Sequence, residues 1–272
     1  MPSIKTNHHI NWNYETEGTG KDLLFIHGWG VDLRIWRQQL KYFSTHRRVI
    51  SVDLPGHGST DWQPDFTLAQ IAEDVITILE AEEAQDVDVV GSSLGGLVAL
   101  KSFEADPAMF GSLIFVGSMP RFSKTSEYPY GVDVQQMLKV SRQLQMKFPD
   151  VLKSFFRSTF TFEERQSRRF KWMERFRRDA EPPNLNAIKE YLEIIYDEDL
   201  RDVLMRVNIP VAFFYGEGDV ICPLAAMEEM KKIVPAGTFQ SFEKLGHFPF
   251  LTAPDQFNEV LDGFLKLRGN RQ

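Results

Sequence analysis

The residue pattern with the clearest chemical meaning is Gly91-Ser92-Ser93-Leu94-Gly95, which fits the motif G-x-S-x-G in one frame only. In that frame Ser93 is the central serine. The apolar run from Val87 to Val90 precedes the motif, and an amphipathic stretch follows it. A serine at such a strand–turn–helix junction sits on a strained turn with its hydroxyl exposed, so Ser93 is the predicted nucleophile. The alternative is an ordinary Ser-Gly turn, because the bare pentapeptide is common by chance.

A serine hydroxyl is a weak nucleophile, so it requires a positioned base. The chain has six histidines, which are His8, His9, His27, His46, His57 and His247. His8 and His9 lie in a polar N-terminal stretch, and His46 lies in a basic loop. His27 and His57 lie in glycine-rich turns, where we expect them to bond to the backbone. His247 follows a predicted strand and precedes the last helix, at the carboxyl edge where open α/β sheets place their chemistry. It is the predicted base.

The base in turn requires an acid that fixes its tautomer and stabilises the imidazolium. The segment Tyr215-Gly-Glu-Gly-Asp219 follows another predicted strand. Asp219 is a better candidate than Glu217, because the turn carries it further toward the carboxyl edge of the sheet. The chain order Ser93, Asp219, His247 is the order of the α/β-hydrolase triad.

Acyl transfer develops an oxyanion, which requires two convergent N–H donors. The backbone N–H of Leu94, directly after the nucleophile, is one candidate. The other is the N–H of Trp29, in the loop His27-Gly-Trp-Gly30 that follows an earlier strand. The Trp29 ring is predicted to line the substrate pocket, to pack as a buried aromatic, or to do both.

Repeated β-α units must position these residues. Near-continuous apolar strands between amphipathic helices predict a mostly parallel sheet with helices on both faces. Thr67 and Gln70 form a capping-box pattern at the start of one helix. The regularity stops between residues 119 and 199, where the chain becomes helical, basic and aromatic. We therefore expect a hydrolase core at 1–118 and 200–272, with 119–199 as a helical lid insertion. The strands are predicted at 23–26, 49–52, 87–90, 113–116, 211–215 and 238–242.

Composition narrows the function classes. The chain has 272 residues and a formal net charge of −7, which argues against nucleic acid as a partner. It has no apolar run long enough to span a bilayer and no apolar signal core, and Cys222 is its single cysteine. We therefore expect a cytoplasmic protein that does not bind membranes. No phosphate-binding loop, dinucleotide fingerprint or metal-ligand spacing is present, so no metal and no cofactor are predicted.

Charge is distributed unevenly along the chain. Residues 121–180 hold 14 Lys and Arg against 7 Asp and Glu, a net charge of +7, while the remainder carries −14. Arg168, Lys171, Arg175 and Arg178 are spaced to form one stripe on a helix, flanked by Arg165 and Arg169. A cationic stripe on an anionic body is able to orient an acidic partner. The alternative is a solvated helix face that pairs with nearby acids.

With these motifs, the chain resembles the α/β-hydrolase superfamily over essentially its whole length. Within it, the chain is most similar to the pimeloyl-[acyl-carrier protein] methyl ester esterases of biotin synthesis. This resemblance implies a serine carboxylesterase that hydrolyses the methyl ester of an acyl chain on an acidic carrier protein, which docks on basic lid residues. Ser92 stands where that family has a tryptophan lining the substrate channel, so the pocket wall should differ. The segments that carry the resemblance are Leu24-Phe-Ile-His-Gly-Trp-Gly30, Val52-Asp-Leu-Pro-Gly56, Ser93-Leu-Gly-Gly-Leu-Val98 and Asp199-Leu-Arg201.

The implied docking residues are the basic stripe with its flanks, together with Arg142. Other readings of the same residues remain open. A general small-ester esterase or a carbon–carbon bond hydrolase of aromatic degradation would share the triad. A receptor that keeps the pocket but does no catalysis is a third reading, and fold alone does not decide among them.

Overall fold

The computed structural model describes residues 2–178 and 181–269, with the side chains of 175–178 and 269 outside the description. An eight-stranded sheet runs through it in the order β1-β2-β4-β3-β5-β6-β7-β8. Neighbouring strands from β4 to β8 are parallel, whereas β2 is antiparallel to both β1 and β4. The bounds are Ser3–Lys5 (β1), Asn11–Glu17 (β2), Asp22–Ile26 (β3), Arg48–Val52 (β4), Val87–Ser92 (β5), Phe110–Val116 (β6), Val211–Gly216 (β7) and Thr238–Phe242 (β8).

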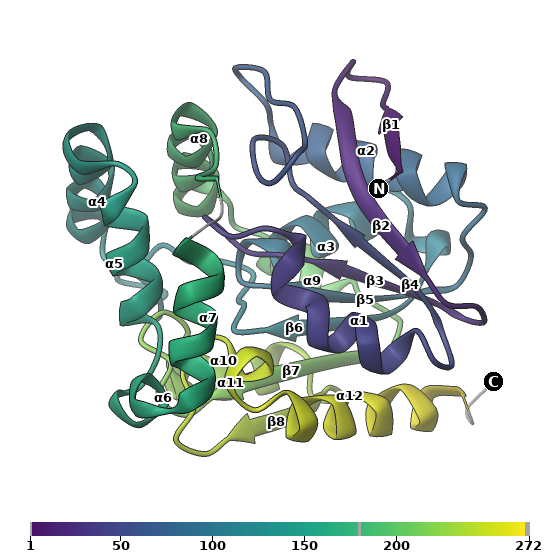
Figure 1. Ribbon diagram of the computed structural model, residues 1–272. Coiled ribbons are helices and arrows are strands. Elements are labelled where there is room, and N and C mark those ends of the chain that lie inside the picture. Colours follow the sequence, from purple (N-terminus) through teal and green to yellow (C-terminus); the bar gives the residue numbers. More distant parts are fainter. Residues whose placement is uncertain (1, 179–180, 270–272) are drawn as a thin grey trace.

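Helices cover both faces of this sheet (Figure 1). Successive residues of β3 go to opposite sides, since Leu24 and Ile26 belong to one apolar cluster and Leu23 and Phe25 to the other. The first cluster includes residues of α2 (Leu68–Ala81), α3 (Leu94–Ala105), α9 (Arg201–Met205) and α10 (Leu224–Ile233). The second includes residues of α1 (Arg37–Phe43), α11 (Pro249–Thr252) and α12 (Pro254–Gly269). Burial on both faces is what the continuous apolar strands require.

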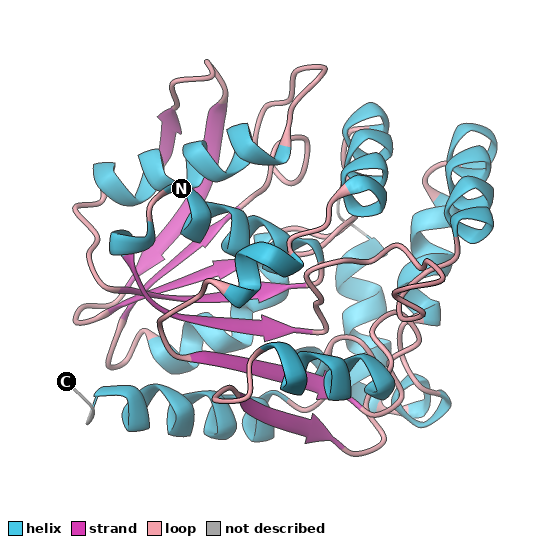
Figure 2. Ribbon diagram, turned by 180° about the vertical axis from the view of Figure 1, so that it is seen from behind, coloured by secondary structure: helices cyan, strands magenta, loops and turns pink. Residues whose placement is uncertain are grey.

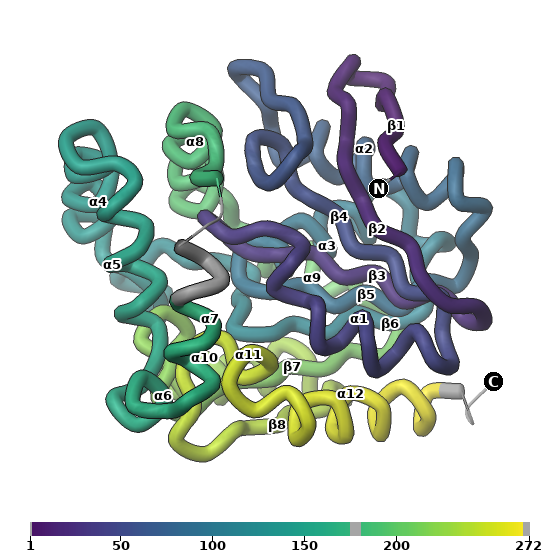
Figure 3. Tube along the Cα trace, in the orientation of Figure 1, coloured from purple at the N-terminus to yellow at the C-terminus, as the bar shows by residue number. Residues whose placement is uncertain are grey.

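The remaining helices lie beyond the carboxyl ends of the parallel strands, as the arrowheads in Figure 2 show. In the chain trace they form the teal and green columns beside the sheet (Figure 3). The chain segment that contains these helices leaves the sheet after β6 and returns to it before β7, and its two ends are bonded to each other. Arg121 bonds Asp199 at 2.5 Å, and the Leu200 N–H donates to Pro120 O at 2.8 Å. The helices are α4 (Val134–Lys147), α5 (Asp150–Ser158), α6 (Phe162–Gln166), α7 (Arg168–Arg178) and α8 (Leu185–Asp197).

The predicted fold class is confirmed, and all six predicted strands are present. The Thr67–Gln70 capping box also forms at the start of α2. The hairpin of β1 and β2 was not predicted, although Trp12, Tyr14 and Thr16 alternate along β2 with the period of a strand. Among the described helices, none has the length and apolar character needed to cross a bilayer.

Candidate active site

Ser93 occupies a sharp turn between β5 and α3. Its backbone lies in the left-handed region, with φ 53° and ψ −120°. A Cβ on Gly91 would lie 2.4 Å from Gly95 O, and a Cβ on Gly95 would lie 2.3 Å from Ile26 O. Only glycine fits at these two positions, because strand and helix approach each other too closely for a side chain. The two motif glycines therefore allow the strained turn that the sequence predicts at Ser93.

Asp219 and His247 are in direct contact. The Nδ1 atom of His247 lies 2.7 Å from Asp219 Oδ2, and both side chains are buried. The other oxygen, Oδ1, accepts from the backbone N–H groups of Ile221 and Cys222 at 2.8 and 3.0 Å. The carboxylate is thus held from its own loop while it faces the imidazole. Glu217, the weaker sequence candidate, accepts instead from the Ser241 hydroxyl.

The turn after β6 lies between the serine and the histidine. The Ser93 N–H donates to Val116 O at 3.0 Å, and the Ser118 hydroxyl donates to Ser93 O at 2.7 Å. Gly117 has φ 53°, and a Cβ there would lie 2.9 Å from His247 Nδ1. The sequence analysis missed this turn, although Gly117-Ser118 directly follows a predicted strand and so had to reach the same sheet edge.

The loop after β3 lies against the nucleophile. A Cβ on Gly28 would be 3.1 Å from Ser93 Cβ. The backbone N–H groups of Trp29 and Leu94 take part in no hydrogen bond recorded for the described residues. Leu94 is the first residue of α3, where an N–H has no partner within the helix. These two donors are therefore free to bind an oxyanion.

The Trp29 side chain is fixed by the α4–α8 segment. Trp29 is 6% exposed, and its Nε1 donates to Ile188 O at 2.8 Å. The ring of Phe155 meets it edge to face at 5.0 Å. Trp29 is therefore packed as a buried aromatic between the loop after β3 and helices α5 and α8.

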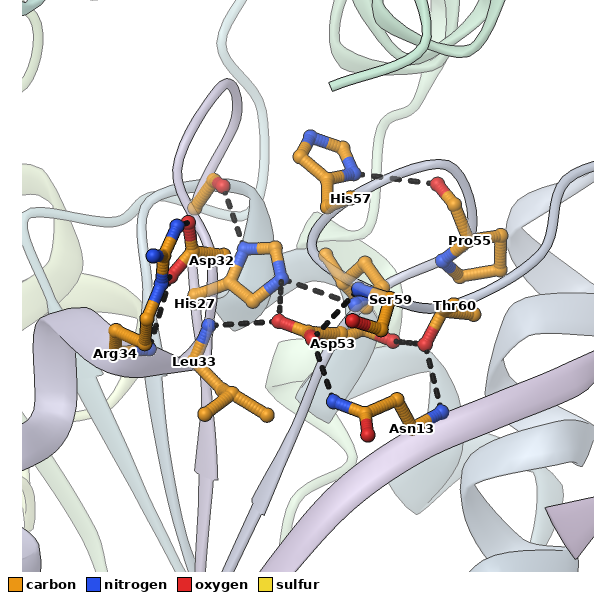
Figure 4. A network of polar contacts seen from close by, with 12 residues as sticks. Asn13, His27, Asp32, Leu33, Arg34, Asp53, Pro55, His57, Ser59 and Thr60 are labelled. Atoms are coloured by element: carbon orange, nitrogen blue, oxygen red, sulfur yellow. Dashed lines mark hydrogen bonds and ion pairs between the residues drawn. The ribbon is translucent and has the colours of Figure 1, made fainter. Parts of the chain in front are cut away.

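Two buried histidines brace this loop (Figure 4). His27 Nδ1 bonds to Gly28 O at 2.8 Å, and its Nε2 accepts from the Leu54 N–H at 2.9 Å. His57 Nε2 accepts from the Gly30 N–H at 3.2 Å. Burial lowers the pKa of His27 and lowers that of His57 to about 3. Both rings are therefore neutral, as an accepting nitrogen requires, and both bond to the backbone as the sequence predicts.

Asp53 completes this network from the start of the loop after β4. Its carboxylate accepts from the Leu33 N–H and the Asn13 amide at 2.8 Å, and from the Ser59 N–H at 3.1 Å. Burial raises the pKa of Asp53, and the hydrogen bonds it accepts oppose that rise. The network joins the loop after β3 to the loop after β4.

Asp219, Cys222 and His247 bring three potential metal ligands within 4.8 Å of one another. The Cys222 thiol donates to Gly117 O at 3.1 Å, and burial raises its pKa well above the ordinary value. A protonated thiol is a poor ligand, and the other two groups are bonded to each other. This set fits a hydrogen-bonded acid–base pair better than a metal site.

The predicted docking residues differ in their surroundings. Arg142 on α4 and Arg168 and Lys171 on α7 are exposed, and Arg165 on α6 is half-buried. Arg169 is turned toward the core, where its Nε donates to Leu251 O at 2.9 Å, so it does not simply flank the stripe. The side chains of Arg175 and Arg178 lie outside the described residues, although α7 contains both positions.

Ser92 is the last residue of β5 and has no exposed surface. Its hydroxyl has no hydrogen-bond partner among the described residues. A buried unpaired hydroxyl costs about 1–3 kcal/mol relative to a paired one. The Ser92 hydroxyl is thus shielded from solvent and unpaired within the described part of the chain.

Comparison with known proteins agrees with this geometry. The family described as "alpha/beta hydrolase fold" matches residues 22–254. Among relatives, the pimeloyl-[acyl-carrier protein] methyl ester esterase of Nitrosomonas europaea is 31% identical over 91% of this chain and 97% of its own. The enzyme of the same name from Aliivibrio salmonicida is 30% identical, with 93% and 95% covered.

Solved structures show the same architecture. An esterase from Exiguobacterium antarcticum superposes with a TM-score of 0.89 at 24% identity, covering 97% of this chain and 98% of its own. A bromoperoxidase from Bacillus anthracis gives 0.86 at 25% identity, covering 94% and 96%. With the family match over most of its length and relatives named as esterases, the chain belongs to the α/β-hydrolase family and is an ester-hydrolysing enzyme of that family.

Proposed function

We propose that this enzyme hydrolyses the methyl ester of an acyl chain attached to an acidic carrier protein, with pimeloyl-[acyl-carrier protein] methyl ester as its substrate. The observation that carries the chemistry is the buried contact of 2.7 Å between Asp219 and His247, beside the strained turn of Ser93. The substrate assignment is supported by the relatives, which share about 30% of their residues with this chain over nearly their full length.

In the first half of the reaction Ser93 is the nucleophile. Because Nδ1 of His247 is hydrogen-bonded to Asp219, Nε2 is the nitrogen that takes the Ser93 proton as Oγ attacks the ester carbonyl. The backbone N–H groups of Trp29 and Leu94 stabilise the oxyanion that develops. His247 then gives its proton to the departing methoxy oxygen, which releases methanol and leaves an acyl-serine.

In the second half water replaces the alcohol. His247 takes a proton from water as its oxygen attacks the acyl-serine carbonyl, and the same two N–H groups hold the second oxyanion. The proton returns to Ser93 Oγ as the C–O bond breaks, and the carboxylic acid leaves. Each step is a proton transfer or an acyl transfer, so the proposed reaction requires no group beyond the chain, the ester and water.

The proposed carrier contact lies on α4 and α7. Arg142, Arg168 and Lys171 are exposed there, within a segment whose net charge is +7. An acidic carrier would be oriented by this charge, with the acyl chain directed toward the carboxyl edge of the sheet (Figure 2). Ser92 is proposed to shape the pocket wall only from behind, because its hydroxyl is fully buried and reaches no surface that an acyl group could contact.

Complementation tests the substrate directly. The gene for this chain should restore growth without biotin to a biotin-requiring strain that lacks its own methyl ester esterase, and the Ser93→Ala variant should not. The purified enzyme should release methanol from pimeloyl-[acyl-carrier protein] methyl ester. Hydrolysis of p-nitrophenyl butyrate without complementation would favour a general small-ester esterase. Inactivity on both substrates would favour a receptor without catalysis.

A further inference from the structure

Glu164, in helix α6, is a buried carboxylate that contacts the loop carrying His247. It is 4% exposed. Its Oε2 accepts from the backbone N–H of Gly246 at 2.8 Å and from that of Thr161 at 2.7 Å. Its Oε1 accepts from the Thr252 hydroxyl at 2.5 Å. One side chain thus binds residues on both sides of His247 in the sequence.

The backbone around Glu164 makes further contacts with the same loop. The His247 N–H donates to Thr159 O at 2.9 Å, and the Thr161 hydroxyl donates to Lys244 O at 2.9 Å. A Cβ on Gly246 would lie 2.2 Å from Thr159 O, so the two segments touch without room for a side chain. The loop that presents His247 is therefore bound along its length to the residues between α5 and α6.

Helix capping alone does not explain these contacts. Glu164 and Thr161 form a capping box at the start of α6, as Gln70 and Thr67 do at the start of α2. The Gln70 side chain is half-buried and bonds only within its own box among the recorded contacts. Glu164 makes two additional bonds, to Gly246 and Thr252, and is almost fully buried. A buried carboxylate is costly unless it is fully hydrogen-bonded, and bonds to an ionised acceptor are about twice as strong as neutral ones.

We infer that Glu164 is a positioning residue for His247, which rests on the proposed role of His247 as the general base. Glu164 does not contact the imidazole. It fixes the backbone on both sides of His247, so that the ring keeps its contact with Asp219 and Nε2 stays available for the proposed proton transfer. A displacement of about 1 Å at a reacting group costs up to about 10²-fold in rate, so loss of this support should lower kcat. KM should change little, because both carboxylate oxygens of Glu164 are bound to protein groups and the inferred support acts on His247 rather than on binding of the ester.

Four variants of the full chain test this inference with p-nitrophenyl butyrate as substrate. Glu164→Ala removes all three bonds. Glu164→Asp keeps the charge but is one methylene too short to reach both Gly246 and Thr252. Glu164→Gln keeps an oxygen for the two N–H groups and an amide for Thr252, whose hydroxyl is able to accept. Glu190→Ala is the matched control, because Glu190 joins α8 to the loop after β4, through the Trp62 side chain and the Asp65 N–H, and has no recorded bond to the loop that carries His247.

We expect Glu164→Ala and Glu164→Asp to lower kcat by about 10- to 100-fold with KM within about twofold of wild type. Glu164→Gln should recover kcat to within about threefold, and Glu190→Ala should change it by less than twofold. If Glu164→Ala does not fold, Glu164→Asp decides the matter. A folded Glu164→Asp enzyme with wild-type kcat would overturn the inference, as would Glu164→Gln losing as much kcat as Glu164→Asp.

Failure of the inference is distinguishable from failure of the proposed function. If Ser93→Ala still hydrolyses the ester, the proposed nucleophile is wrong and the role of His247 falls with it. If Ser93→Ala is inactive while Glu164→Asp retains full kcat, the proposed chemistry stands and only the positioning role is overturned.

Discussion

The sheet-edge loops and the exposed basic side chains of α7 hold charged groups in opposite ways. Asp219 and His247 are buried, and every polar atom named for Asp219 has a fixed partner. Arg168 and Lys171 are exposed, and the described residues record no ion pair for either. The first arrangement holds its atoms in one geometry through several hydrogen bonds, whereas the second supplies a field without fixed geometry. Substitutions in the loops should therefore lower the rate of hydrolysis of any ester. Substitutions on the exposed face of α7 should alter only the encounter with a charged partner.

The largest expected effect is at the serine. Ser93→Ala should lower ester hydrolysis by at least about 10³-fold, since the members of a triad act as a unit. It should also abolish covalent labelling by a fluorophosphonate probe. Ser92→Ala is the matched control and should leave labelling intact. If Ser92→Ala lost labelling and Ser93→Ala retained it, the nucleophile would be Ser92, and our assignment of the motif to Ser93 would be wrong.

The next effect is at the acid. Asp219→Asn should lower kcat by about 10³- to 10⁴-fold, because an amide favours the wrong tautomer of His247 while leaving the loop in place. Glu217→Gln should stay within about threefold, since Glu217 accepts from Ser241 rather than from His247. Thermal unfolding of both variants checks that the fold is retained. Similar losses of kcat in the two variants would contradict the assignment of Asp219.

Much of the sheet-edge region could be predicted from sequence, because its signals are local. A continuous apolar run predicts a buried parallel strand, and the residue that follows it must reach the carboxyl edge. Ser93 and Asp219 follow such runs, as does Gly117, which was overlooked, whereas His247 follows the shorter, half-polar edge strand β8. The Asp219–His247 contact of 2.7 Å shows that the two loops predicted to carry these residues meet.

The contacts of Glu164 could not be predicted in this way. The pattern Thr161-x-x-Glu164 predicts the start of a helix, but Gly246 is 82 positions away and nothing near Glu164 points to it. The contact of Arg169 with Leu251 O is hidden for the same reason, because helical spacing gives the face of a residue and not the partner of that face. Long-range polar contacts of the α4–α8 segment therefore required the structure.

A third prediction concerns the buried loops that brace Trp29. His57 is neutral when folded, with a pKa of about 3, whereas the ordinary value is about 6.5. Between these values the unfolded chain binds a proton that the folded chain does not, so stability falls as pH falls. For this one group the loss is at most about 1.4 kcal/mol per pH unit below 6.5.

Urea unfolding of the wild type and His57→Asn at pH 7.5, 6.5, 5.5 and 4.5 measures this effect. The wild type should lose more stability than the variant at each step below pH 6.5, and the two should change nearly equally between pH 7.5 and 6.5. Parallel curves over the whole range would mean that His57 is not held neutral by its burial.

The smallest expected effect is on the exposed face. The double variant Arg168→Glu/Lys171→Glu should raise KM for a carrier-bound methyl ester by about tenfold in 50 mM salt, because it reverses two charges that steer an acidic partner. Values of kcat, and both parameters on p-nitrophenyl butyrate, should stay within about twofold, since the loops that hold Ser93 and His247 are untouched. In 0.5 M salt the Debye length shortens to about 4 Å, so the difference in KM should shrink to about twofold.

The control is the double variant Lys5→Glu/Lys41→Glu, which makes the same change in net charge on β1 and α1, away from α7. It should leave KM for the carrier-bound ester near the wild-type value. An equal rise in KM in both double variants would show that net charge alone governs the encounter. Loss on the small ester as well would show that α7 supports the site itself, and the contrast between the two regions would no longer hold.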